Sequence, residues 1–79
     1  MQKQFKIGEY AVGGIIKISK SQDVITVQAL DYNSKKCIME ERFHTERPGF
    51  IAQIDHFLND LTTSYYADKI INYIKTKLI

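Results

Sequence analysis

Residues 37–61, CIMEERFHTERPGFIAQIDHFLNDL, contain the change of periodicity that decides the fold. Before Thr45 the side chains alternate with a period of two, which is typical of a strand. One face is predicted to carry Cys37, Met39 and Phe43, and the other Ile38, Glu40, Arg42 and His44. After Pro48, which suits the first turn of a helix, apolar residues recur with a helical period. They are Phe50, Ile51, Ile54, Phe57, Leu58 and Leu61.

The residues before this stretch are predicted to form three further strands, at Phe5–Val12, Ile15–Ser19 and Val24–Leu30. Short polar turns separate the later strands, and short connections favour an antiparallel meander. Gly13-Gly14 can adopt a positive φ at both positions and so suits a two-residue hairpin turn. The alternative is one long strand from Glu9 to Ser19 in which the glycines form a bulge.

A second helix is predicted to follow the first. Thr62-Thr63-Ser64 breaks the first helix and offers an N-cap for the second. The apolar stripe of the second helix is Tyr66, Ala67, Ile70, Ile71, Ile74 and Leu78. Because each stripe must be buried against another element, we expect both helices to pack on one face of the sheet. The predicted fold is α+β: a four-stranded antiparallel β-meander followed by two C-terminal helices (β-β-β-β-α-α), in a single domain of residues 1–79.

The length of the chain, 79 residues, suffices for one domain with a modest core. Domains of this size are often stabilised by a disulfide, a metal or a partner subunit. The single Cys37 excludes an intramolecular disulfide, and no Cys/His cluster suggests a metal. The N-terminus lacks the apolar segment of a signal peptide, and no run approaches the roughly 18 apolar residues that cross a bilayer. We therefore expect a cytoplasmic protein without membrane association.

The sequence contains no motif of catalysis, nucleotide binding or metal binding. Cys37 and His44 are an odd number of positions apart on one strand, so they point to opposite faces and cannot form a dyad. We expect Cys37 to be a small buried side chain. His56 and Asp60 form an i,i+4 pair of a kind common on solvated helix surfaces. Gly13-Gly14 does not precede a helix and lacks the N-terminus that binds phosphate.

These observations predict a protein that is not an enzyme and has no cofactor, metal or small-molecule substrate. Self-association, or binding of another protein, is the first functional hypothesis. The sheet face away from the helices is predicted to carry an apolar patch of Ile15, Val24, Leu30 and Ile38. A monomer seldom leaves such a patch in water. The second helix adds Tyr65 and Tyr73, a residue type favoured at interfaces. The alternative is a patch that a loop or terminus closes.

Binding of single-stranded nucleic acid is the second functional hypothesis. The formal net charge is +2, and basic groups neutralise phosphates while aromatic rings stack on bases. The residues predicted on or near the open face are Lys6, Lys17, Arg42, Tyr10 and Tyr32. The predicted order, four antiparallel strands and then a helix, is similar to that of the Pur-alpha and Whirly type of single-strand binder. This resemblance of strand order implies a single-strand-binding function.

Overall fold

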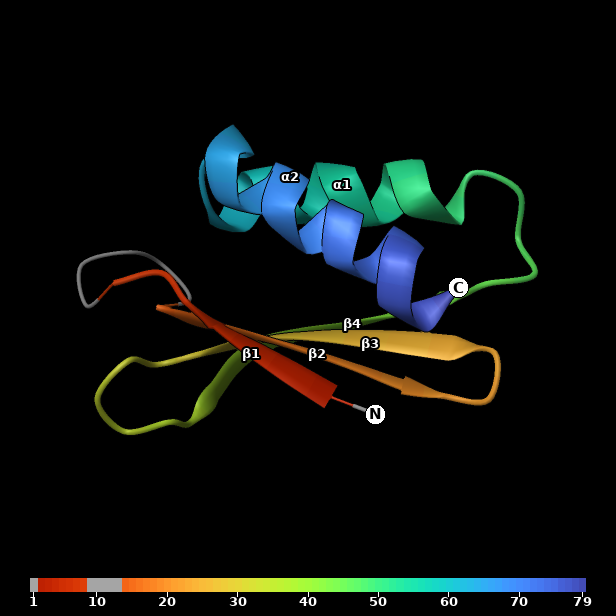
Figure 1. Ribbon diagram of the computed structural model, residues 1–79. Coiled ribbons are helices and arrows are strands. Elements are labelled where there is room, and N and C mark those ends of the chain that lie inside the picture. The colour runs from red at the N-terminus through yellow and green to blue at the C-terminus, as the bar shows by residue number, and fades with distance from the viewer. Residues whose placement is uncertain (1, 9–13) are drawn as a thin grey trace.

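A computed structural model describes residues 2–8 and 14–79 and shows one sheet with helices on one side (Figure 1). The strands and helices are β1 (Gln2–Lys6), β2 (Ile15–Ser21), β3 (Val24–Leu30), β4 (Cys37–His44), α1 (Phe50–Leu61), α2 (Ser64–Tyr73) and the π-helical η1 (Ile74–Leu78). The strands lie in the order β1-β2-β3-β4, and each pairs antiparallel with its neighbour. The structure confirms the predicted α+β class and the order of its elements.

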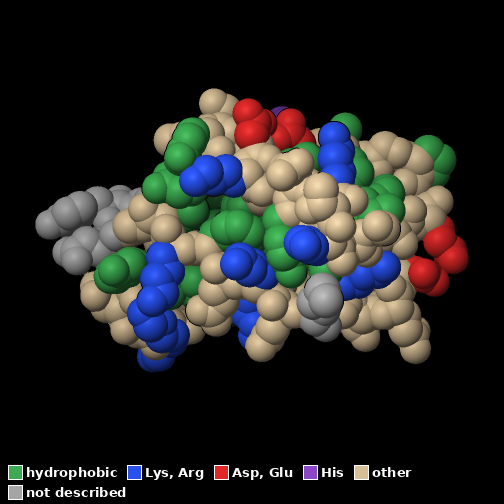
Figure 2. All heavy atoms as spheres, in the orientation of Figure 1, with side chains coloured by type: hydrophobic (Ala, Val, Ile, Leu, Met, Phe, Trp, Pro, Cys, Tyr) green, Lys and Arg blue, Asp and Glu red, His purple; other side chains and the backbone are tan. Residues whose placement is uncertain are grey.

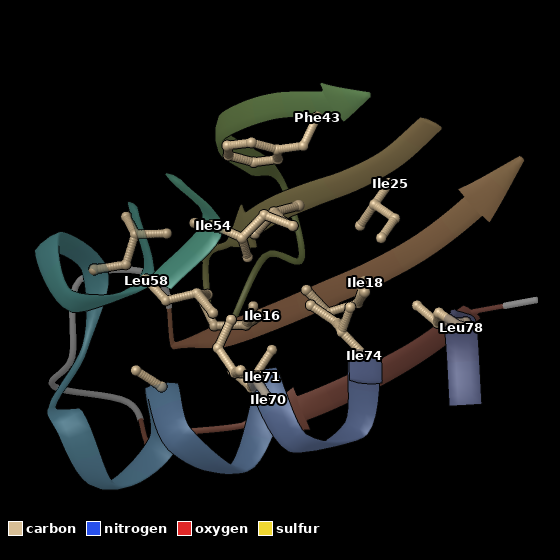
Figure 3. Close-up of a cluster of buried hydrophobic side chains, with 14 residues drawn as sticks. Ile16, Ile18, Ile25, Phe43, Ile54, Leu58, Ile70, Ile71, Ile74 and Leu78 are labelled. Atoms are coloured by element: carbon tan, nitrogen blue, oxygen red, sulfur yellow. The ribbon is translucent and has the colours of Figure 1, made fainter. Parts of the chain in front are cut away.

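The core lies between the sheet and the helices, and both layers contribute aliphatic side chains to it (Figure 3). From the sheet come Ile16, Ile18, Ile25, Val27 and Ala29. From the helices come Ile54, Leu58, Ile70 and Ile74, which Figure 3 shows on the side of the sheet that carries Ile16 and Ile18. A buried Ile or Leu side chain stabilises a fold by roughly 1.5–3 kcal/mol. Burial of this one sheet face therefore holds the two layers together.

The helical layer begins after Gly49, whose φ of 78° lies in the left-handed region that glycine adopts at little cost. Helix α1 ends at Leu61 and α2 begins after Thr63, so the predicted break is confirmed. The Thr63 side chain makes no capping hydrogen bond. At the other end, Nζ of Lys20 in β2 donates to the carbonyl oxygen of Leu78 at 2.8 Å. This hydrogen bond ties the end of η1 to the sheet.

The first strand differs from its prediction. It covers Gln2–Lys6 rather than Phe5–Val12, and residues 9–12 of the predicted strand lie outside the described residues. The segment QKQFK contains one apolar residue, Phe5, so the ladder with β2 rather than any periodicity of its own sets the position of β1. Strand β2 also runs further than predicted, to Ser21.

The two-residue turn predicted at Gly13-Gly14 is wrong. Such a turn would place Val12 opposite Ile15, whereas the ladder partner of Ile15 is Lys6. Gly13 lies outside the described residues, as does the start of the alternative long strand. Gly14 occupies a crowded position, where an added Cβ would lie 2.7 Å from the Gly8 carbonyl oxygen and 2.7 Å from Cβ of Tyr32. Gly8 and Tyr32 approach this position so closely that only a residue without a side chain fits there.

Strand β4 contains a bulge that the sequence pattern did not predict. Ala29 pairs with Met39 but Leu30 pairs with Cys37, so Ile38 is an extra residue in the strand. A bulge shifts the facing of the residues beyond it by one position. Cys37 therefore lies on the face of Leu30, and its predicted place beside Met39 is wrong. Its predicted burial is wrong too, because Cys37 lies at an exposed end of β4.

Candidate interaction surface

The side of the sheet away from the helices, called here the open face, is a grid of cross-strand rows. The register gives three rows that cross all four strands: Gln2-Ser19-Thr26-Arg42, Gln4-Lys17-Gln28-Glu40 and Lys6-Ile15-Leu30-Cys37. A shorter row, Ser21-Val24-His44, lies beside the turn between β2 and β3. Two of the complete rows are entirely polar, so most of the open face is suited to water.

The four apolar residues predicted on the open face differ in their exposure. Ile15 is 1% exposed and Leu30 is 7% exposed, so neither offers surface to a partner of the isolated chain. Neither belongs to the main core cluster. Val24 is half-buried, and only Ile38 is freely exposed, at 52%. The burial of Ile15 and Leu30 agrees with the alternative hypothesis, in which the apolar patch is closed. Ile38, in contrast, is exposed on the edge strand β4.

Strand β4 is the most exposed element of the sheet. It forms one edge, and seven of its eight residues are exposed. An edge strand presents a row of unpaired backbone N–H and C=O groups that can pair with another strand. Its large apolar side chains Ile38 and Met39 are 52% and 43% exposed. These features together define what we call the β4 edge, the residues Cys37–His44 and their outward backbone groups.

Opposite charges lie next to one another along the β4 edge. Nη2 of Arg42 is 3.6 Å from Oε2 of Glu40, and Nε2 of Gln28 donates to Oε1 of Glu40 at 2.7 Å. Glu40 is therefore held from two sides on the open face. Glu41 points to the helix side, because its ladder partner is the buried Val27. The edge thus presents a Glu and an Arg on one face and a further Glu on the other.

The other edge of the sheet, β1, is shorter and more basic. It has five residues, of which two are lysines, Lys3 and Lys6. Phe5 turns inward, where its ring makes an edge-to-face contact with Tyr73 at a centroid distance of 5.7 Å. On the side of the molecule where β1 and α2 face the viewer, Lys and Arg side chains gather across the middle of the surface (Figure 2). Lysines on an edge oppose pairing with another strand.

The two predicted helix tyrosines lie in different environments. Tyr73 is half-buried against Phe5 and therefore packs within the chain. Tyr65 is 61% exposed, with its ring 5.1 Å from that of Tyr66 and 4.6 Å from Nζ of Lys69. The interaction with Tyr65 raises the pKa of Lys69. Tyr65 is thus an exposed aromatic residue on the helical layer, away from the β4 edge.

The residues predicted to bind nucleic acid are only partly brought together. Lys6, Lys17 and Arg42 lie on the open face, in three different rows. Tyr10 lies outside the described residues. Tyr32 lies in the loop after β3, half-buried, with Nζ of Lys35 5.0 Å from the centre of its ring. In the described rows no aromatic side chain lies on the open face, so the basic groups there have no stacking platform beside them.

A shallow depression of about 400 Å³ lies at one corner of the open face. Its lining is Ser21, Gln22, Val24, Thr26, Arg42 and His44. His44 and Arg42 come from β4, so the depression opens beside the β4 edge.

The candidate catalytic groups remain apart. Cys37 and His44 occupy opposite ends of β4, and Nε2 of His56 lies 3.9 Å from Oδ2 of Asp60 on an exposed helix surface. Within residues 2–8 and 14–79, no group of three His, Cys, Asp or Glu side chains is placed to hold a metal ion. In the same part of the chain, no helix is long and apolar enough to cross a membrane.

The sequence pattern identified Ile38 but missed Met39 and the pairing of Glu40 with Arg42. The alternation of side chains correctly predicted that Met39 lies on the helix side of the sheet. It did not predict that Met39 is exposed, because the helices do not cover this end of β4. The signal that could have found it is the strand order, since the last strand of a meander is an edge.

Comparison of the chain with protein-family models, curated proteins and solved structures finds no match.

Proposed function

We propose that this chain is a small, non-enzymatic protein-interaction domain that self-associates through the β4 edge. The proposal rests on one observation: the eight-residue edge strand β4 also carries the exposed apolar side chains of Ile38 and Met39. Pairing with another strand would satisfy the outward backbone groups and remove both side chains from water. A domain of this size also has little stability to spare, so burial between copies is a gain.

The β4 edge is better suited to this role than the other predicted surfaces. The open face is mostly polar, and its Ile15 and Leu30 are already buried. The β1 edge is shorter and carries Lys3 and Lys6. On the helical layer, Tyr65 is exposed as a single aromatic side chain. A cytoplasmic location belongs to the same proposal and is supported by Cys37, an exposed free thiol of the kind that persists in a reducing compartment.

Sedimentation equilibrium on the whole chain, from micromolar to millimolar concentration, tests the proposal. A single strand edge is a small contact, near the low end of the roughly 1,200–2,000 Å² of stable interfaces, so we expect a weak, concentration-dependent dimer. Met39→Lys should reduce dimerisation by placing a charge on the edge. The matched control Tyr65→Lys adds the same charge on the helical layer and should leave it unchanged. A wild-type monomer at millimolar concentration rejects self-association, and loss of dimer only in Tyr65→Lys moves the contact to α2.

Binding of single-stranded nucleic acid is a second candidate function, favoured by the common face of Lys6, Lys17 and Arg42. It is tested by titrating a labelled single-stranded oligonucleotide at low and moderate salt. Phosphate contacts are strongest at low salt, so absence of binding there rejects this function. If binding occurs, Lys6→Glu with Lys17→Glu should abolish it, whereas the control Lys75→Glu on η1 should not.

A further inference from the structure

We infer that β4 pairs antiparallel with β4 of a second copy of the chain, about a two-fold axis that passes through Glu41. The two sheets then form one continuous sheet with the helices of both copies on the same side. The inference rests on the proposed self-association and adds its symmetry, its register and the residues that select both.

Symmetry leaves few registers for such a pair. Two identical antiparallel strands related by a two-fold axis pair residues whose numbers add to a constant. Residues that are directly opposite lie on the same face of the sheet, so this sum must be even and the axis must pass through a residue. The midpoint of β4 lies between Glu40 and Glu41. Axes near this midpoint keep most of the strand paired, so the choices are Met39, Glu40, Glu41 or Arg42.

Charge selects among these four registers. An axis at Met39 places Glu40 opposite Ile38 and Glu41 opposite Cys37, so it brings no opposite charges together. An axis at Glu40 places that carboxylate opposite its own copy, and an axis at Arg42 does the same with two guanidinium groups. An axis at Glu41 places Glu40 of each copy opposite Arg42 of the other, which gives two attractive pairs on the open face. It also places Glu41 opposite its copy on the helix side. Opposite-charge pairs stabilise and like charges destabilise to similar extents, so the two favourable pairs outweigh the single unfavourable one.

The same register covers the two exposed apolar side chains of the edge. With the axis at Glu41, Met39 lies opposite Phe43 of the second copy. Both residues face the helix side, because their ladder partners are Ala29 and Ile25 of the core. A thioether beside an aromatic ring is a favourable contact. The register therefore gives Met39 a partner of suitable chemistry.

Ile38 gains a partner on the open face. As the extra residue of the bulge it lies beyond the Met39–Phe43 pair, beside His44 of the second copy, and His44 lines the depression of about 400 Å³. Each copy thus contributes an aliphatic side chain beside the corner depression of the other. The alternative contact, β4 of one copy against β1 of the next, joins Glu-bearing and Lys-bearing edges but is heterologous and does not close. It would produce assemblies that grow beyond the dimer.

Engineered cysteines test the register. In a Cys37→Ser background, Glu41→Cys places two thiols directly opposite one another, at the Cα separation of about 4.5–5.5 Å of an antiparallel pair. This separation permits a disulfide. We expect mild oxidation to yield a covalent dimer of Glu41→Cys. The control His44→Cys leaves both charge pairs intact and places the thiols six residues out of register, with Cα atoms more than about 7 Å apart, so it should remain monomeric under denaturing electrophoresis. Cross-linking of the control instead of Glu41→Cys overturns the assigned axis.

Charge exchange tests the pairs that select the register. Glu40→Arg and Arg42→Glu each convert both attractive pairs into repulsive ones, so each variant alone should dimerise about tenfold more weakly than the wild type. An equimolar mixture should form the heterodimer, since Arg at positions 40 and 42 of one copy then faces Glu at both positions of the other. With an axis at Glu40 or Arg42, residues 40 and 42 are not opposite one another and neither exchange creates a new repulsive pair, so undiminished dimerisation of either variant overturns the inference.

The outcomes separate the inference from the proposed function. A wild-type dimer that Met39→Lys weakens, without a Glu41→Cys cross-link and without rescue in the mixture, leaves self-association in place and rejects this register. A wild-type chain that stays monomeric rejects both. Growth beyond the dimer with rising concentration also rejects the two-fold pairing and points to the β4-to-β1 contact.

Discussion

Gly14 lies at a position where the surrounding chain leaves no room for a side chain. Its carbonyl oxygen accepts hydrogen bonds from the backbone N–H groups of Ile7 at 2.8 Å and Gly8 at 3.3 Å. The added Cβ of Gly14→Ala would press against the Gly8 carbonyl and Tyr32. We expect this overpacking to destabilise the fold by about 1–3 kcal/mol, measured by the urea midpoint. An unchanged midpoint would show that these segments do not approach one another.

Asp31 shapes the loop between β3 and β4 through its carboxylate. The side chain accepts the backbone N–H groups of Ser34 at 2.8 Å and Asn33 at 3.1 Å. The hydrogen bond from the Ser34 backbone is the main cause that lowers the pKa of Asp31 below its ordinary value of 3.8. The folded state therefore holds this proton less tightly than the unfolded chain does.

This difference predicts a pH dependence of stability. The contribution of Asp31 should be complete above the unfolded pKa of 3.8 and should be lost as the pH falls through the lower pKa of the folded state. Thermal melts of the wild type and Asp31→Ala between pH 2 and pH 7 check it. We expect the difference in Tm to shrink toward the acid end. A difference that is constant with pH would exclude the carboxylate as its source.

The helix stripe is the element on which the fold most depends. Ile54 of α1 is buried in the core cluster between the helices and the sheet. Ile54→Ala should cost about 2–5 kcal/mol, and Ile54→Asp should unfold a domain of this size. The control Gln53→Ala, at an exposed position of the same helix, should lie within about 0.5 kcal/mol of the wild type. A cooperative, near-wild-type melt of Ile54→Asp would contradict the core-facing assignment.

The hydrogen bond from Lys20 to Leu78 fixes the end of the helical layer. Removing the charged donor while keeping the apolar stem, in Lys20→Met, should cost about 1 kcal/mol. It should also speed amide exchange in η1 more than in α1. Lys17→Met is the matched control, because Lys17 lies on the opposite face of the same strand. Equal effects of the two variants would show that the bond does not hold η1.

The elements that bury one face were predictable from the sequence, and the others were not. Strand β3 has the predicted bounds, Val24–Leu30, and helix α1 covers the predicted apolar stripe, Phe50–Leu61, because the spacing of apolar residues in each reflects the burial of one side. Pro48 was predicted in the first helical turn but lies before the N-cap Gly49. Strand β1 has no such pattern, and pairing with β2 determines where it lies. The bulge at Ile38 is also a property of the ladder, since it appears only when β4 is paired with β3.

At the scale of the whole molecule, the candidate surface was predicted only in part. The open face follows from placing both helices on one side, and Ile38 was expected on it. The burial of Ile15 and Leu30 was not predicted, because alternation gives the face on which a residue lies but not what covers it. The arrangement leaves both edge strands exposed, and β4 is the longer of the two.

Hydrogen exchange of backbone amides, recorded at increasing protein concentration, tests most directly whether the sheet continues from one copy to the next through β4. The amides of β4 that point away from β3 should exchange rapidly in the dilute chain and become protected as the dimer forms. The amides on the outer side of β1 should exchange at the same rate throughout. Concentration-dependent protection that appears at β1 or α2, with the outward amides of β4 unchanged, would contradict the account.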